Sequence, residues 1–183
     1  MEEFPEILQI VCSYLNENDI NYVIVGGVAV MYHGVPRTTV DIDFLLQIEE
    51  EQISSFADFL NSKGFKASAT DILVAFNEKS HSTLFFKETL LRLDIQGINS
   101  DFDRMTLDRA ILVDLFGTMV RIGSAEDTIV NKILFQGEQD LRDALGIIKR
   151  NPKNLDFDYI QSTCQMLGIE GLLQQFLKDS QTE

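Results

Sequence analysis

Two aspartates separated by one residue, Asp41 and Asp43, stand inside the apolar run 40–46. Valine, isoleucine, phenylalanine and leucine dominate that run, which predicts a β-strand on which every second side chain faces the same way. The two aspartates would then share one face, with Cα atoms about 6.6 Å apart, since a strand rises about 3.3 Å per residue. Carboxylates at that spacing converge on one divalent ion or flank two. Without a cation they repel each other.

A second apolar run repeats this pattern. In residues 90–97, leucine and isoleucine alternate with Arg92, Asp94 and Gln96, so these three polar side chains face one side of a predicted strand. If this strand lies beside the first, Asp94 becomes a third carboxylate for the same ions. Hard oxygen donors of this kind select Mg²⁺ or Mn²⁺ rather than zinc.

A glycine pair follows the first β-rich run. Gly26 and Gly27 come directly after residues 22–25 and precede a predicted short helix. Because glycine has no side chain, backbone N–H groups at a helix start can approach a phosphate closely. A phosphate cradle near a carboxylate pair indicates a nucleoside triphosphate carried as its magnesium complex. Arg37, four residues before Asp41, is placed to neutralise a phosphate or a leaving pyrophosphate.

Short strands and helices must position these residues. Apolar residues at helical spacing predict helices over 3–17, 28–33, 50–63, 125–136, 138–149, 156–167 and 169–178. Runs rich in β-forming residues predict strands over 22–25, 40–46, 65–69, 83–86, 90–95, 112–116 and 119–122. Strands followed by helices predict an α+β fold with a C-terminal helical layer. We expect a core over 1–123 and a helical region over 124–183, packed on that core or continuous with it as one domain.

Charge and cysteine content exclude several classes of protein. The 183 residues include 15 Lys and Arg against 29 Asp and Glu, a formal net charge of −14, which argues against binding a long nucleic acid or an anionic membrane. Cys12 and Cys164 form no CxxC motif, so a zinc ribbon is excluded, and either two buried thiols or one bridge between them stays open. The acidic N-terminus and the absence of an apolar run of about 20 residues indicate a soluble cytoplasmic protein.

The order of these motifs resembles a known signature. Gly26-Gly27, thirteen further residues and then Asp41-Ile42-Asp43-Phe44 are similar to the signature of the DNA-polymerase-β-like nucleotidyltransferase superfamily. In that superfamily a glycine turn precedes an Asp-x-Asp strand, and a later strand supplies a third aspartate, a place that Asp94 suits. The resemblance implies a mixed sheet of the nucleotidyltransferase type with flanking helices.

The sequence of residues 37–43 looks most like that of a small prokaryotic subgroup, which includes minimal nucleotidyltransferases and AbiEii-like toxins. Members carry a lysine on the first C-terminal helix and an Asp-x-x-Asp run on the next, places that Lys132, Asp140 and Asp143 match. Gln139 stands where the family often has a basic residue. The resemblance implies nucleotide contacts at Gly26, Gly27, Arg37, Thr39, Lys132 and Asp140.

The implied activity is transfer of a nucleoside monophosphate to an acceptor hydroxyl. Asp41, Asp43 and Asp94 would hold two Mg²⁺ (or Mn²⁺) ions with the triphosphate. A protein, a tRNA end and a small molecule remain open as acceptors. If the likeness to toxins holds, an antitoxin protein is an expected partner. The alternatives are a non-catalytic nucleotide- or metal-binding interaction module on the same fold, and a structural domain that binds divalent cations.

Less specific interpretations of the same residues also stay open. The chain has two further Asp-x-Asp pairs, at 101–103 and 156–158, which we interpret as solvated turn or helix-start residues. Lys132 could be a lysine whose charged end reaches the surface. Asp140 and Asp143 could be surface acids that pair with Arg142 and with cations near Lys149.

Overall fold

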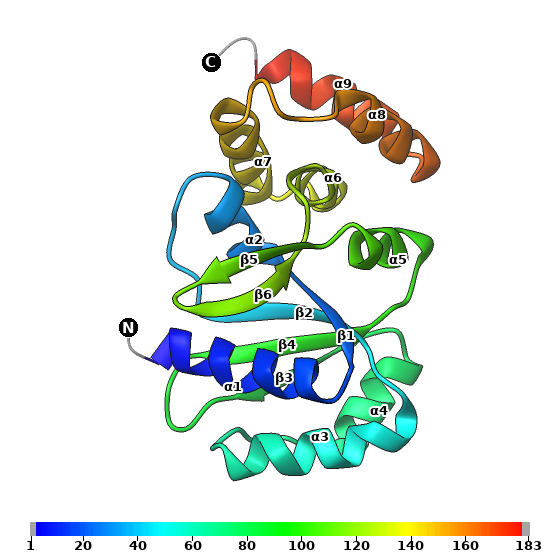
Figure 1. Cartoon of the computed structure of the whole chain (residues 1–183). Coiled ribbons are helices and arrows are strands. Elements are labelled where there is room, and N and C mark those ends of the chain that lie inside the picture. Colours follow the sequence, from blue (N-terminus) through cyan, green and yellow to red (C-terminus); the bar gives the residue numbers. More distant parts are fainter. Residues whose placement is uncertain (1–2, 181–183) are drawn as a thin grey trace. The chain divides into compact units, whose positions relative to one another are not determined.

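The computed structural model describes residues 3–180, which form a six-stranded mixed sheet and nine helices (Figure 1). The strands are β1 (Asn21–Val25), β2 (Asp41–Gln47), β3 (His81–Phe85), β4 (Arg92–Gly97), β5 (Ile111–Leu115) and β6 (Thr118–Ile122). The helices are α1 (Glu3–Glu17), α2 (Gly26–His33), α3 (Glu50–Ser62), α4 (Ala69–Asn77), α5 (Asp101–Asp108), α6 (Ala125–Phe135), α7 (Glu138–Arg150), α8 (Phe157–Met166) and α9 (Glu170–Asp179). The predicted α+β class is confirmed.

The sheet runs in the order β3-β4-β2-β1-β6-β5. β2 is antiparallel to β1 and parallel to β4, while β3 pairs antiparallel with β4. The hairpin of β5 and β6 joins the other side of the sheet through the parallel pair of β1 and β6. β2 and β4, which carry the predicted carboxylates, are therefore direct neighbours.

The chain divides into two compact units. The first unit comprises the residues up to Gly27 together with 39–123, and the second comprises 28–38 together with the residues from Ser124 onward. One division between the units falls between 123 and 124, and the segment 28–38 is grouped with the C-terminal helices. The extent of a catalytic core over 1–123 stays a prediction.

In the first unit, helices cover the sheet. α1 packs against β1 and β6, α4 packs against β3 and β4, and α3 packs against α4. The helical spacing of apolar residues explains this packing, because it gives α1 one continuous buried face. That face consists of Ile7, Leu8, Val11, Cys12 and Leu15.

In the second unit, α6 contacts α7, α8 and α9. The segment 28–38 is held on α7 by hydrogen bonds to backbone carbonyls. Arg150 donates to the carbonyl of Gly34 at 2.5 Å, and Asn151 donates to that of His33 at 2.8 Å. Gly34 permits close packing, since a Cβ there would lie 2.9 Å from the side chain of Ile147.

Several predicted elements differ from the observed ones, and β3 and β4 also begin two residues away from their predicted starts. The predicted strand 65–69 reduces to an isolated bridge between Phe65 and Phe86. α4 begins already at Ala69, inside the predicted strand, because the Ser68 hydroxyl caps this helix by accepting a hydrogen bond from the amide of Asp71 at 3.2 Å. The short helix α2 begins at Gly26, two residues earlier than expected.

Other expectations about single residues are confirmed. Cys12 and Cys164 are both buried free thiols. The two further Asp-x-Asp pairs lie at helix starts, as Asp101 opens α5 and Asp156 caps α8.

Within residues 3–180, no helix has the length and apolar character needed to cross a membrane.

Candidate active site

The first unit places three carboxylates on one face of two neighbouring strands. In the parallel register of β2 and β4, Asp43 stands opposite Asp94 and Asp41 stands opposite Arg92. Ile42 and the other apolar residues that alternate with these positions are buried on the opposite face. The pleat therefore brings Asp41, Asp43 and Asp94 to a common side of the sheet, which is the arrangement expected from the sequence.

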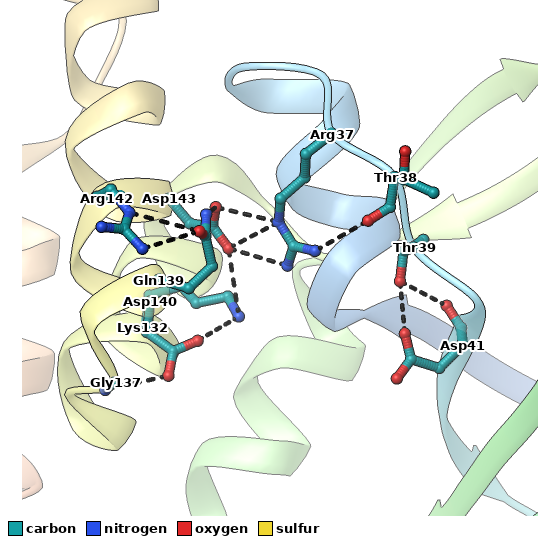
Figure 2. Close-up of polar contacts among 10 residues, drawn as sticks. All are labelled: Arg37, Thr38, Thr39, Asp41, Lys132, Gly137, Gln139, Asp140, Arg142 and Asp143. Atoms are coloured by element: carbon teal, nitrogen blue, oxygen red, sulfur yellow. Dashed lines mark hydrogen bonds and ion pairs between the residues drawn. The ribbon is translucent and has the colours of Figure 1, made fainter.

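Asp41 is held by two side chains. The Thr39 hydroxyl donates to Asp41 Oδ1 at 2.5 Å (Figure 2), and Arg92 Nη2 donates to Asp41 Oδ2 at 3.0 Å. Partial burial acts to raise the pKa of the Asp41 carboxyl. The hydrogen bonds from Thr39 and from the backbone, with the charge of Arg92, outweigh that effect, so the pKa lies below the usual value for an aspartate. Asp41 is therefore a carboxylate at neutral pH.

Asp94 has a matching environment. The Thr83 hydroxyl donates to Asp94 Oδ1 at 2.5 Å, and Arg92 Nε lies 3.5 Å from Asp94 Oδ2. Arg92 thus contacts two of the three predicted carboxylates. The alternation along the strand predicts the face on which Arg92 lies but not its partners. Thr83 was missed, because its pairing with Asp94 depends on the register of β3.

The glycine pair allows a close approach to these strands. Gly26 has φ +60°, and a Cβ there would lie 2.0 Å from Asp43 Oδ2. A Cβ on Gly27 would lie 2.8 Å from Thr39 Oγ1. Gly26 combines this close approach with a left-handed φ, which favours glycine there. A side chain at Gly27 would require Thr39 to shift. Both constraints exist whether or not a phosphate binds there.

The second unit contains the remaining predicted residues in one network, the Asp143 cluster, formed by Arg37, Lys132, Gln139, Asp140 and Asp143 (Figure 2). Arg37 donates to both oxygens of Asp143, from Nε at 3.1 and 3.2 Å and from Nη2 at 3.0 Å. Gln139 donates to Asp143 Oδ1 at 2.7 Å. Lys132 Nζ donates to Asp140 Oδ1 at 2.7 Å and lies 3.7 Å from Asp143 Oδ2.

This cluster is largely removed from solvent. The side chain of Asp143 is 4% exposed and that of Lys132 is 10% exposed. The interpretation of Lys132 as a surface lysine is therefore wrong. Asp140 and Asp143 pair with Lys132 and Arg37, not with Arg142 or Lys149. Arg142 instead pairs with the exposed Glu138.

The carboxylates of the first unit have the right chemistry for a hard divalent ion. All three supply oxygen donors, the type that Mg²⁺ and Mn²⁺ prefer. Within residues 3–180, no three histidine, cysteine or acidic side chains are gathered closely enough to ligate an ion without rearrangement. Arg92 stands between two of the carboxylates.

The architecture is that of the nucleotidyltransferases. An antigenic nucleotidyltransferase-like protein from Paracoccidioides brasiliensis is 19% identical with a TM-score of 0.54, over 97% of this chain and 93% of that one. The antibiotic-resistance factor ANT(2'')-Ia is 11% identical with a TM-score of 0.56, over 100% and 97%. The lincosamide antibiotic adenylyltransferase LnuA is 19% identical with a TM-score of 0.52, over 80% and 94%. At such identities the likeness shows the fold alone.

The amino-acid sequence supports a narrower assignment. Over residues 4–166 the chain matches the family described as nucleotidyltransferase of unknown function (DUF6036), and it belongs to that family. No curated protein sequence matches the chain. The predicted resemblance to nucleotidyltransferases is thereby confirmed, and the protein is an enzyme of that class.

Proposed function

We propose that this protein transfers a nucleoside monophosphate from a nucleoside triphosphate to an acceptor hydroxyl, with Mg²⁺ or Mn²⁺ as cofactor. One observation carries the proposal. The register of β2 and β4 sets Asp43 opposite Asp94 and leaves Asp41 on the same face. The family assignment gives the class of reaction, and these three residues give it a chemical centre.

Asp41, Asp43 and Asp94 would hold two divalent ions together with the triphosphate. When bound, such ions neutralise the phosphates and stabilise the attacking and leaving oxygens of an in-line displacement. The low pKa of Asp41 favours this role, because the carboxylate is already ionised when a cation arrives. The Thr39 and Thr83 hydroxyls each hold one oxygen of Asp41 or Asp94, and so fix the plane of the carboxylate.

We assign the acceptor side of the reaction to Asp94. Asp94 would hold the ion that activates the attacking hydroxyl and would assist the deprotonation of that hydroxyl, while Thr83 retains its hydrogen bond to Oδ1. Attack on the α-phosphorus forms the new P–O bond to the acceptor and breaks the bond to pyrophosphate. Most of the rate enhancement would come from positioning and charge neutralisation.

Phosphate contacts are assigned to two glycines and two cations. Gly26 and Gly27 would offer backbone N–H groups, and Thr39 would act by holding Asp41. The resemblance to AbiEii-like proteins supports Arg37 and Lys132 as phosphate-binding cations, with Asp140 as the carboxylate that positions Lys132. Their mutual contacts within the Asp143 cluster support the assignment, because charged groups that are already held lose little entropy on binding.

The acceptor is the least constrained part of this proposal. The net charge of −14 argues against a long nucleic acid, which leaves a protein, a tRNA end or a small molecule. The structural neighbour LnuA is an adenylyltransferase whose crystal structure contains bound lincomycin, which supports a small-molecule acceptor. A toxin role, with an antitoxin as partner, rests on the resemblance to AbiEii-like proteins. The two free thiols fit the reducing cytoplasm.

The test compares the wild type with Asp41→Asn/Asp43→Asn. We expect the variant to lose Mg²⁺-dependent binding of every nucleoside triphosphate, and pyrophosphate release to fall by about a hundredfold or more. The matched control is Glu51→Gln/Asp58→Asn, which removes two exposed carboxylates of α3 in the same unit. Circular dichroism checks that all three proteins are folded. Equal binding and turnover by the wild type and the Asp41/Asp43 variant would refute the proposal.

A second candidate function is a non-catalytic nucleotide-binding module. Gln139 favours it, because the position that is often basic in AbiEii-like proteins carries an amide, and that amide is engaged by Asp143 at 2.7 Å. This module would bind a nucleotide together with Mg²⁺ and release no pyrophosphate with any acceptor. A purely structural cation-binding domain would instead show metal-dependent melting that is independent of nucleotide.

A further inference from the structure

Arg92 occupies an unusual place for a residue of a cation-binding site. It begins β4, stands opposite Asp41 in the register and precedes Asp94 by two residues on the same face. Its guanidinium contacts Asp41 Oδ2 through Nη2 at 3.0 Å and lies with Nε 3.5 Å from Asp94 Oδ2. One positive side chain therefore spans two carboxylates that are proposed to hold metal ions.

Hydrogen bonds from two threonines orient the carboxylates of Asp41 and Asp94. Thr39 holds Asp41 Oδ1 and Thr83 holds Asp94 Oδ1, both at 2.5 Å. The two Oδ2 atoms both lie against the guanidinium of Arg92, that of Asp41 beside Nη2 and that of Asp94 beside Nε. A divalent cation would be attracted by the same two oxygens.

We propose that Arg92 is an internal counter-ion that neutralises Asp41 and Asp94 in the metal-free protein, and that a divalent cation binds by displacing it. The inference rests on the proposed metal-dependent function and adds a residue that controls the affinity of its site. Arg92 keeps two nearby carboxylates from repelling each other before the metal arrives. It also competes with the metal for their Oδ2 atoms, which lowers the affinity for the ion alone.

Two opposite effects follow from removing this guanidinium. Without metal, Asp41 and Asp94 lose their shared positive neighbour, so the first unit becomes less stable. With metal, the ion no longer competes with the guanidinium of Arg92 for the two carboxylates, so it binds more tightly. A residue that merely supported the fold, or that helped to position the metal ligands, would not produce tighter binding.

The experiment measures Mn²⁺ affinity by electron paramagnetic resonance of the free ion, and melting temperature with and without Mn²⁺, on the full chain. The variant is Arg92→Gln. The matched control is Lys87→Gln, which removes one positive charge from the same unit, at an exposed ion pair with Glu6. For Arg92→Gln we expect binding about two- to fivefold tighter than wild type, which corresponds to the strength of a partly exposed ion pair. We also expect a lower melting temperature without Mn²⁺ and a larger rise on its addition. The control should match wild-type affinity.

The variant Arg92→Lys keeps the result interpretable if Arg92→Gln does not fold. Lysine carries the charge but lacks the planar fork that reaches both carboxylates. The Arg92→Lys protein should therefore bind Mn²⁺ more tightly than wild type and less tightly than Arg92→Gln. Affinity at or below the wild-type value in the folded variants would overturn the counter-ion role while leaving the proposed function intact. Failure of the wild type and of both variants to bind Mn²⁺, with or without a nucleoside triphosphate, would overturn both proposals.

Discussion

The Asp143 cluster makes a quantitative prediction about stability. Replacing Asp143 with asparagine preserves shape but removes the negative charge that Arg37 contacts through three hydrogen bonds and that Lys132 approaches. Breaking a fully buried ion pair by removing one partner costs about 3–5 kcal/mol. The Arg37 side chain is 30% exposed and Lys132 retains Asp140 at 2.7 Å, so solvent and the remaining acid reduce the loss. We expect Asp143→Asn to lower the free energy of unfolding by about 2–3 kcal/mol.

Urea unfolding followed by far-ultraviolet circular dichroism measures this loss, since the chain has no tryptophan to report by fluorescence. The control is Glu138→Gln on the same helix, α7, which breaks the ion pair with Arg142 between side chains that are 86% and 59% exposed. An exposed pair of this spacing contributes about 0.3–0.5 kcal/mol. A loss for Asp143→Asn no greater than that of the control would refute the view that the cluster is desolvated and tightly paired.

Two further predictions concern a glycine and a buried thiol. Gly26→Ala should lower the free energy of unfolding, measured in urea, by about 2 kcal/mol or more, because it combines a left-handed φ with displacement of Asp43. The control Gly117→Ala, with φ +82° and nothing within 4 Å of the added Cβ, should lower it by about 1 kcal/mol. Similar losses for the two variants would contradict the steric argument. Cys12 is fully buried, which raises its pKa to about 12 from 9.0, so at pH 8 a thiol reagent should label it only after denaturation. Because an unfolded thiol ionises first, stability should fall from about pH 9 toward pH 12, and less so in Cys12→Ala; prompt labelling of the native protein would contradict this.

The sequence predicted the common face of the three carboxylates because that face depends on a local rule. Side chains alternate along a strand, so Asp41 and Asp43 had to share a side, and Asp94 had to share one with Arg92. The neighbouring position of β2 and β4 was an added assumption, and the observed register bears it out. The roles of these residues in catalysis stay predictions.

Contacts between distant residues were not predictable in the same way. Arg37 meets Asp143 across 106 positions of sequence, and no periodic pattern encodes that pairing. The contact of Arg92 with Asp41 needs both the register and the direction of a long flexible side chain. The wrong strand at 65–69 has another cause, since the capping of α4 by Ser68 outweighed the β-forming tendency of the residues before it.

The interruption of the first unit by residues 28–38 restricts how the polypeptide can be cut. A fragment ending at residue 123 would keep this segment but lose α7, whose Arg150 and Asn151 satisfy its carbonyl groups. The buried Val28 and Val30 would also be left without the helices of their own unit. We therefore expect neither half, cut at 123/124, to fold autonomously, although the two halves co-expressed would be suited to reassociate. Limited proteolysis in this region should accordingly yield nicked but still associated protein.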